Sequence, residues 1–252
     1  MSLPVIELTN ISFGYNSKPI LDDVSLVVER GDFVGVVGSN GTGKSTLIRL
    51  ALGLLSPARG EIRLLGQNIT RFREWHRIGY MAQKVASFNT GFPATVREIV
   101  ETHLRTQKSP HGSLSRRAIK TRVEQALDLT GMREAGNSLI GELSGGQQQR
   151  VFLARVLAGD PEVMFLDEPL VGIDAASQQL FCSILDDYNR ERGLTILMVT
   201  HDPAHIVDRI NRLACLEQGK LFLHESPEEI RQELAQSTVT HHHPIYHHHS
   251  LG

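Results

Sequence analysis

The chain has 252 residues, of which 40% are hydrophobic and 21% are charged, a balance that is typical of a globular protein with a sizeable core. Its formal net charge is −2 and it contains no long basic run, which argues against a nucleic-acid-binding surface. No apolar run approaches the ~18 residues of a membrane span and no signal peptide is recognisable, so we expect a cytoplasmic protein that reaches a membrane only through a partner.

The first quarter of the chain predicts strands and one helix. Residues 5–8 and 24–28 are rich in β-branched side chains, and residues 33–37 form a continuous apolar run, so each segment predicts a strand. A helix is expected over 44–54, and a short strand is expected over 60–66, between two glycines.

Helical patterns dominate the middle of the chain. Thr95, Ser115 and Ser144 each precede such a pattern, and their hydroxyls can accept hydrogen bonds from the backbone N–H groups of a first helical turn. Residues at 3–4 spacing predict the buried face of the helix after Ser115: Ile119, Val123, Ala126 and Leu127. We therefore expect a mostly helical insert at roughly 86–160 within an α/β core.

Strand and helix patterns alternate again from residue 163. Continuous apolar runs at 163–166 and 196–199 are typical of parallel strands covered on both faces. The helix between these strands is marked by four residues: Leu180, Ile184, Leu185 and Tyr188. Cys182 and Cys215 lie in apolar stretches, which favours buried thiols over a disulfide or a metal pair.

The stretch GSNGTGKST fits the phosphate-binding pattern G-x-x-x-x-G-K-[ST], with a strand expected before it and a helix after it. Glycines let backbone N–H groups converge on phosphate oxygens, and a helix start adds N–H groups and the positive end of its dipole. Lys44 supplies a cation for the β- and γ-phosphates, and the Ser45 hydroxyl can hold Mg²⁺. The predicted nucleotide-binding residues are Gly38, Ser39, Asn40, Gly41, Thr42, Gly43, Lys44, Ser45 and Thr46.

Two carboxylates, Asp167 and Glu168, end the apolar run at 163–166. Asp167 would reach Mg²⁺ through water, and Glu168 could take a proton from the attacking water. A solvated acidic strand end is the alternative, and the phosphate-binding loop earlier in the chain favours the catalytic interpretation.

The stretch LSGGQ at 143–147 combines a hydroxyl, two glycines and a helix start, which together suit a second anion. A second phosphate-type site in a chain with one phosphate-binding loop makes sense if it serves a neighbouring chain's nucleotide. From this segment alone, a simple helix cap remains the alternative.

Taken together, these stretches resemble the motifs of ATP-binding-cassette ATPases, in the family's order, over about residues 3–225. LSGGQQQR at 143–150 is similar to the family's signature, GSNGTGKST to its P-loop, and VMFLDEP to its Walker B strand with the catalytic glutamate. Four more residues match by position: the adenine-stacking Tyr15, the glutamine Gln83 at the edge of the insert, Asp174 of the D-loop, and the switch histidine His201. Taken singly, Tyr15 could be a surface aromatic and His201 a core histidine.

The resemblance implies an α/β fold with a P-loop NTPase core, an N-terminal antiparallel β subdomain and a helical signature subdomain. It implies one ATPase domain over 1–225 and a tail over 226–252. Catalysis would fall to Glu168, His201 and Gln83, with ATP as substrate and Mg²⁺ held by Ser45, Gln83 and Asp167. In a head-to-tail homodimer, the signature face would complete the partner's nucleotide site with Ser144, Gly145, Gly146, Gln147 and Asp174.

The resemblance also implies transmembrane permease partners that dock near residues 84–98, where Phe88 and Phe92 stand in a polar segment, and indirectly an extracytoplasmic substrate-binding protein. VGID in place of the commoner SALD, together with SFNTGFPATVREIV, is similar to the zinc and manganese importer branch. Met81-Ala82 stands where Val-Pro is frequent, but no catalytic group is lost. Another cargo, export, a soluble non-transport cassette ATPase, and a kinase or GTPase are the alternatives; a kinase or GTPase would leave LSGGQ unexplained.

The tail contains six histidines within nine positions: His241, His242, His243, His247, His248 and His249. SPEE at 226–229 predicts a helix start, and no fixed structure is expected beyond Gln236. Imidazole is largely neutral near pH 7 and binds Zn²⁺, and a flexible chain can supply its ligands without a preformed pocket. We hypothesise a weak zinc sensor or buffer; a purification tag or a solvated end is the alternative.

Overall fold

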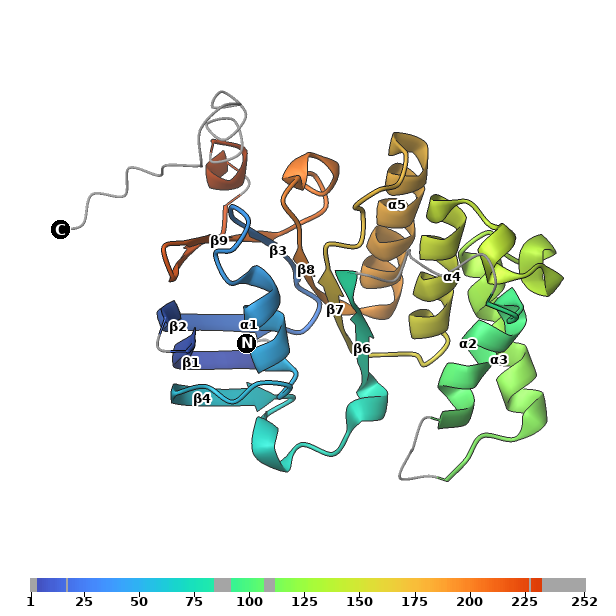
Figure 1. The fold of residues 1–252 in the computed structure, drawn as a ribbon, viewed down its shortest axis with the longest axis horizontal. Coiled ribbons are helices and arrows are strands. Elements are labelled where there is room, and N and C mark those ends of the chain that lie inside the picture. Colours follow the sequence, from blue (N-terminus) through green and yellow to red (C-terminus); the bar gives the residue numbers. More distant parts are fainter. Residues whose placement is uncertain (1–3, 17, 84–91, 107–111, 227, 233–252) are drawn as a thin grey trace. The chain divides into compact units, whose positions relative to one another are not determined.

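A computed structural model describes residues 4–16, 18–83, 92–106, 112–226 and 228–232. The chain divides into two compact units (Figure 1). The first contains residues 1–70 and 199–252, and the second contains residues 71–198.

The first unit contains the antiparallel β subdomain and the strand that leads into the P-loop. Its four-stranded sheet has the order β2-β1-β4-β5, and β1 pairs antiparallel with both of its neighbours. β3 pairs in parallel with β9, and β10 pairs antiparallel with β9. The bounds are β1 (Pro4–Tyr15), β2 (Lys18–Glu29), β3 (Phe33–Val37), α1 (Lys44–Ala51), β4 (Arg59–Leu64), β5 (Gln67–Asn68), β9 (Arg212–Glu217) and β10 (Lys220–His224), with 3₁₀ turns at Ile69–Arg71, which runs into the second unit, and Pro203–His205.

The second unit contains the helical insert and the strands around it. β7 lies between β8 and β6 and is parallel to β6. In Figure 1 the helices α2, α3 and α4 lie side by side, coloured green to yellow, and all three contact one another. The bounds are β6 (Ile78–Met81), α2 (Val96–Thr106), α3 (Arg116–Leu129), α4 (Gly145–Leu157), β7 (Val163–Asp167), α5 (Ala175–Arg192) and β8 (Thr195–Val199), with 3₁₀ turns at Trp75–Arg77, Glu134–Asn137 and Ile140–Glu142.

Helix starts in the insert follow the predicted caps. The Ser115 and Ser144 hydroxyls accept hydrogen bonds from the backbone N–H groups of Ala118 (3.2 Å) and Gln147 (3.3 Å). Thr95 exchanges bonds with Glu98 in the same way, which satisfies N–H groups that a helix start leaves open. The residues that α3 buries are the predicted ones: Ile119, Val123, Ala126 and Leu127.

One predicted helix boundary is corrected by the structure. The helix expected over 44–54 ends at Ala51, because Gly53 adopts a φ of +65°. The Gly53 N–H donates to Leu50 O (2.9 Å), and the Leu54 N–H donates to Arg49 O (2.8 Å). These two hydrogen bonds form a Schellman motif. Leu180 lies within α5 as expected but is 43% exposed, whereas the other three marker residues are buried.

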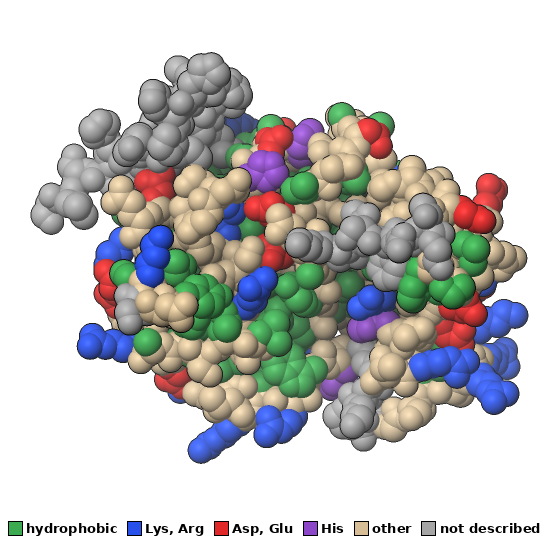
Figure 2. All heavy atoms as spheres, viewed as in Figure 1, with side chains coloured by type: hydrophobic (Ala, Val, Ile, Leu, Met, Phe, Trp, Pro, Cys, Tyr) green, Lys and Arg blue, Asp and Glu red, His purple; other side chains and the backbone are tan. Residues whose placement is uncertain are grey.

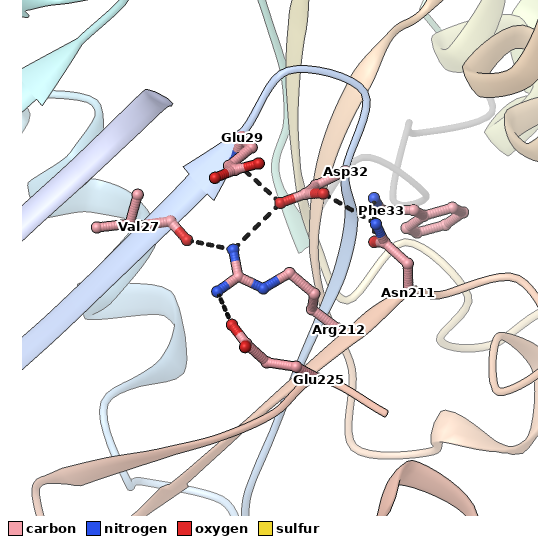
Figure 3. A network of polar contacts seen from close by, with 7 residues as sticks. All are labelled: Val27, Glu29, Asp32, Phe33, Asn211, Arg212 and Glu225. Atoms are coloured by element: carbon pink, nitrogen blue, oxygen red, sulfur yellow. Dashed lines mark hydrogen bonds and ion pairs between the residues drawn. The ribbon is translucent and has the colours of Figure 1, made fainter. Parts of the chain in front are cut away.

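The loop before β3 is held by a network of polar contacts (Figure 3). Asp32 accepts hydrogen bonds from Glu29 N (2.9 Å) and Asn211 Nδ2 (2.8 Å), and its Oδ2 lies 3.2 Å from Arg212 Nη1. Arg212 also donates to Val27 O (2.6 Å) and pairs with Glu225. The Asp32 and Arg212 side chains are only 12% and 14% exposed, so these contacts offset the cost of removing two charges from water.

The helix start predicted at 226–229 and the buried cysteine thiols are confirmed. Ser226 Oγ accepts from Glu229 N (3.1 Å), as the predicted helix start requires. Cys182 and Cys215 are buried thiols. None of the described helices has the length and apolar character needed to cross a membrane.

We predict that protonation of His103 destabilises the fold. His103 lies on α2, and burial, together with the nearby Arg155, lowers its pKa. In the unfolded chain a histidine has a pKa of about 6.5, so as pH falls the unfolded state binds this proton before the folded state does. The contribution of neutral His103 to the free energy of unfolding is therefore complete above about pH 6.5 and is lost as pH falls through the folded-state pKa. The melting temperature should fall between pH 7.5 and 5.5, and the fall should be smaller in His103→Gln.

Thr102→Gln is the matched control, because Thr102 is an exposed neighbour on the same helix. It should retain the wild-type dependence of melting temperature on pH. A His103→Gln protein that shows the full wild-type fall would contradict the assignment.

Candidate functional site

The P-loop runs from the end of β3 to the start of α1. Lys44 is buried, and its Nζ donates to the carbonyl oxygens of Gly38 and Ser39, both at 2.9 Å. Thr42 closes the turn by donating its hydroxyl to Ser39 O (3.0 Å). No side chain of the described residues caps the start of α1, where Gly43 occupies the N-cap with a φ of +106°. A helix start that no side chain caps can present its N–H groups to an anion.

Gly41 and Gly43 serve different purposes, although one reason was predicted for both. A Cβ on Gly41 would meet nothing within 4 Å, so this position leaves open space beside the loop, as a bound phosphate requires. A Cβ on Gly43 would lie 2.7 Å from Ile20 Cγ2 and 3.0 Å from Leu21 Cδ2. Gly43 is therefore also required where α1 packs against β2.

Tyr15 and His201 belong to the same unit as the P-loop. Tyr15 ends β1 with 42% of its surface exposed, and its ring meets that of Phe13 edge to face at 4.9 Å. The Thr200 N–H donates to Val36 O on β3 (3.1 Å), so His201 follows directly after a contact with the strand that leads into Gly38. Both side chains are exposed, and the interpretation of His201 as a core histidine is wrong.

Asp167 is the last residue of β7 in the second unit, Glu168 follows it directly, and both are buried. Glu168 has a φ of +48°, an uncommon conformation for a residue with a side chain, and one that is often found at functional sites. Gln83 Nε2 donates to Glu168 Oε2 at 2.8 Å. Two residues 85 positions apart, both predicted to act on ATP, are therefore in direct contact, and the interpretation of a solvated acidic strand end is wrong.

The signature segment and the D-loop each begin a capped helix. Ser144 and Gln147 form a reciprocal capping box: Ser144 N donates to Gln147 Oε1 at 2.9 Å. Asp174 accepts from the Ser177 N–H at 2.9 Å, and this bond is the main reason why the pKa of Asp174 is lowered. The helix-cap interpretation of LSGGQ is therefore confirmed for the single chain, and its role toward a second nucleotide stays a prediction.

A feature that the sequence analysis missed repeats in these two segments. Gln148 Nε2 donates to the carbonyls of Ile140 and Leu143, both at 3.1 Å. Gln178 Nε2 donates to those of Leu170 (3.1 Å) and Ile173 (3.2 Å), with the same sequence offsets. A glutamine four residues after each cap residue would have been the pattern to look for. Each glutamine fixes the loop that precedes its helix.

Gly146 is required by close packing between α4 and α5. A Cβ on Gly146 would lie 2.3 Å from Ser177 Oγ and 2.6 Å from Ser177 Cβ. The glycine predicted for anion binding therefore also lets the signature helix approach the first turn of the helix that follows the D-loop.

Several predicted residues fall outside the described part of the chain. Phe88 and the tail histidines lie in segments 84–91 and 233–252, so the docking and zinc predictions are untested there. Phe92 is described and is 43% exposed. Across the described residues, no group of three or more His, Cys, Asp or Glu side chains is placed to hold a metal ion.

Comparison with known families decides what this site belongs to. The family model for ABC transporters matches residues 21–171, a span that contains the P-loop, the signature, Asp167 and Glu168. This chain belongs to the ABC transporter family. It is an ATPase, the ATP-binding subunit of such a transporter, and its P-loop NTPase fold is as predicted.

Relatives of the cassette include subunits named for metal transport. The zinc uptake system ATP-binding protein ZurA of Listeria innocua is 39% identical over 86% of this chain and 84% of its own. The manganese transport system ATP-binding protein MntB of Bacillus subtilis is 40% identical over the same shares, 86% and 84%. Among solved structures, cbiO1 from Clostridium perfringens, part of the ABC transporter complex cbiONQ, has a TM-score of 0.80, 27% identity and 94% coverage of both chains.

A further structural relative bears on assembly. The ATP-binding cassette MJ0796, solved as a dimer in a post-hydrolysis state bound to ADP and Pi, has a TM-score of 0.75 and 26% identity, covering 87% of this chain and 98% of that one. Cassettes of this family bind ATP, dimerise and work with membrane permease subunits.

We predict that Gly146→Ala destabilises the cassette by about 1–3 kcal/mol, because the new methyl group overpacks against Ser177. Gly145→Ala is the matched control, since its Cβ would lie 3.6 Å from the nearest heavy atom, an ordinary contact. Chemical denaturation measures both.

Ser177→Gly should relieve the clash. In a double-mutant cycle, Gly146→Ala with Ser177→Gly should be less destabilised than the sum of the two single variants, although Ser177→Gly itself costs about 0.5 kcal/mol in helix propensity. Simple additivity would contradict the proposed contact.

Proposed function

We propose that the cassette powers the import of a divalent metal ion, zinc or manganese. The observation that carries this proposal is the sequence likeness over 86% of the chain to subunits named for zinc uptake and for manganese transport. A cassette named for spermidine and putrescine import is 33% identical, so family membership alone does not select the cargo. Cargo selection then belongs to the partner chains, in keeping with the lack of a metal-ligand cluster among the described residues.

Within this proposal, ATP is bound by the first unit's motifs. Tyr15 stacks on adenine, the P-loop N–H groups hold the phosphates, and Lys44 neutralises charge on the β- and γ-phosphates. The open space beside Gly41 and the α1 start that no side chain caps support this assignment. His201 contacts the γ-phosphate, supported by its exposure and by the Thr200–Val36 hydrogen bond.

Glu168 is proposed as the base for hydrolysis. It takes a proton from water as the water oxygen bonds to the γ-phosphorus, and the bond to the bridging oxygen breaks so that ADP leaves with the electron pair. The Gln83–Glu168 hydrogen bond supports this role, because an amide donor can hold the carboxylate in one orientation. Gln83 is then a residue that positions the base as well as a candidate metal ligand.

Mg²⁺ is the expected companion of ATP. The candidate ligands are the Ser45 hydroxyl, the Gln83 amide and the Asp167 carboxylate, and these hard oxygen donors are the kind that Mg²⁺ prefers. When bound, Mg²⁺ would neutralise charge on the phosphates. Asp167 is buried at the end of β7, which restricts the directions from which it can be approached.

Two cassettes are proposed to close head to tail around two ATP molecules. Ser144, Gly145, Gly146, Gln147 and Asp174 would then complete the partner's site. The dimeric relative bound to ADP and Pi supports this arrangement. The capped, glutamine-braced starts of α4 and α5 support it too, since preformed surfaces lose less entropy on association.

The proposed location is the cytoplasmic face of the membrane, where the cassette binds permease subunits through residues 84–98. An extracytoplasmic substrate-binding protein would deliver the cargo to the permease. The histidine tail stays a prediction as a weak zinc sensor or buffer, in keeping with a zinc-importing system.

Removal of either key side chain should stop hydrolysis. Lys44→Ala should abolish Mg²⁺-dependent ATPase activity through loss of phosphate binding. Glu168→Gln should lower turnover by about 10²–10⁴-fold through loss of the base, with ATP binding retained. Phosphate release and nucleotide-binding assays separate the two effects.

Lys120→Ala and Glu191→Gln change the same charges at exposed positions and should hydrolyse ATP normally. In size-exclusion runs, Glu168→Gln should form dimers with ATP and stay monomeric with ADP. Wild-type turnover by Glu168→Gln would reject its role as base.

The cargo is tested by transport. Proteoliposomes that contain the cassette with its permease and binding protein should accumulate zinc or manganese only when ATP is supplied on the side of the membrane that carries the cassette. Glu168→Gln assemblies should bind ATP without sustained uptake. Uptake of spermidine, or of another organic cargo, without uptake of either metal would reject the proposed cargo and leave the ATPase assignment intact.

A further inference from the structure

A cavity of about 480 Å³ lies in the second unit, and none of the P-loop residues or the signature residues 143–150 lines it. It opens between α3, the C-terminal end of α4 and the C-terminal half of α5. This volume lies in the range of small-molecule sites, roughly 300–1,000 Å³. None of the residues proposed for ATP hydrolysis lines it.

One part of the cavity is apolar. Leu157 and Tyr188 are buried, whereas Leu129, on α3, is 47% exposed at the cavity. A large apolar side chain that faces an open cavity beside an aromatic residue can cover the apolar portion of a ligand.

Two cations, Arg122 on α3 and Arg192 on α5, also line the cavity. The Arg192 guanidinium lies 5.7 Å from the centre of the Tyr188 ring. Neither arginine forms an ion pair with another described residue, whereas their neighbours Arg133 and Arg190 pair with Asp128 and Asp186. The dipole of α5 accounts for a cation at its C-terminal end, but Arg122 lies in the middle of α3, where no helix end attracts it.

The carboxylates at the cavity already have partners. Asp160 accepts a hydrogen bond from the Tyr188 hydroxyl at 3.1 Å, and Asp128 is bonded to Arg133 at 2.7 Å. Burial first, and Asp160 second, raise the pKa of Tyr188 to about 12, so this hydroxyl remains a donor at neutral pH. With Asp128 neutralised by Arg133, Asp160 offsets one of the two lining arginines, which leaves one positive charge in excess.

The exposed face of α3 adds to this positive field. Arg116, Arg117 and Lys120 are exposed and belong to the first half of the helix that carries Arg122. Figure 2 shows Lys and Arg side chains gathered where Figure 1 draws α3. A local cluster of cations raises the concentration of anions near the cavity and speeds their arrival.

We propose that this cavity binds a small amphipathic anion, with its phosphate or carboxylate group against Arg122 and Arg192 and its planar apolar group against Leu129, Leu157 and Tyr188. Guanidinium groups bind both phosphates and carboxylates with paired hydrogen bonds. The two arginines therefore require an anionic group with two acceptor oxygens, which either kind of anion supplies. A carboxylate neutralises the one excess positive charge, and a phosphate monoester, with a charge of about −1.5 to −2 at pH 7, exceeds it.

The test is a calorimetric titration of the full-length cassette with phenyl phosphate and with benzoate, in saturating ADP so that the P-loop is occupied. Inorganic phosphate and phenol are the comparison probes, since each carries one half of the proposed ligand. At least one of phenyl phosphate and benzoate should bind more tightly than inorganic phosphate and phenol, and the better binder identifies the preferred anionic group.

Arg122→Gln and Arg192→Gln should each weaken binding of that probe by about tenfold, the value of one lost charge-assisted hydrogen bond. Arg117→Gln and Arg190→Gln remove the same charge from the same two helices at exposed positions and are the matched controls. Melting curves confirm that all four variants fold.

Two results would overturn the proposal. The first is no saturable binding of phenyl phosphate or benzoate at millimolar concentration. The second is equal weakening by the lining and the control variants, which would indicate a general surface field instead of a site. Neither result bears on ATP hydrolysis or on metal transport, so the proposed function is tested separately.

Discussion

The pairing of Asp32 with Arg212 is the interaction on which the nucleotide-binding unit depends. Both oxygens of Asp32 accept hydrogen bonds, and Arg212 connects β9 to Val27 and to Glu225 (Figure 3). A buried charge pair is tolerable only when its remaining donors and acceptors are satisfied, so this network admits one arrangement of the loop before β3. Because β3 leads directly into the P-loop, the same arrangement sets where the phosphate donors begin.

After β3, the conformation of the P-loop and of α1 is fixed by contacts within and next to the loop. Lys44 holds two carbonyls of the loop, Gly43 packs against β2, and the Schellman motif at Gly53 ends α1 after only eight residues. The second unit uses a different device: α4 and α5 begin with side-chain caps, Ser144 and Asp174, and share the same pattern of glutamine hydrogen bonds to the preceding loop. In both units, the surfaces proposed to meet nucleotide are held by hydrogen bonds within the chain, and fixed donors are what electrostatic catalysis needs.

The chemistry and the cargo of the cassette are separate questions. Hydrolysis depends on a few side chains held at strand ends, and Glu168 illustrates how: a left-handed backbone and a hydrogen bond from Gln83 orient one carboxylate. Among the described residues, no group of three or more His, Cys, Asp or Glu side chains is placed to hold a metal ion. The cavity beside Tyr188 lies at the end of α4 opposite the signature, so an occupant there would contact the helix that carries the signature.

The sequence by itself determined whatever depends on residues close together in the chain. The caps at Ser115, Ser144 and Ser226, the buried face of α3 and the P-loop pattern all involve spacings of three to eight residues, at which backbone geometry alone brings groups together. Only the tertiary structure decided the contacts between distant segments. Asp32 and Arg212 are 180 residues apart, Gly146 meets Ser177 from another helix, and three helices enclose the cavity at Tyr188. No local pattern encodes such pairs, because which faces meet is settled by the packing of the whole core.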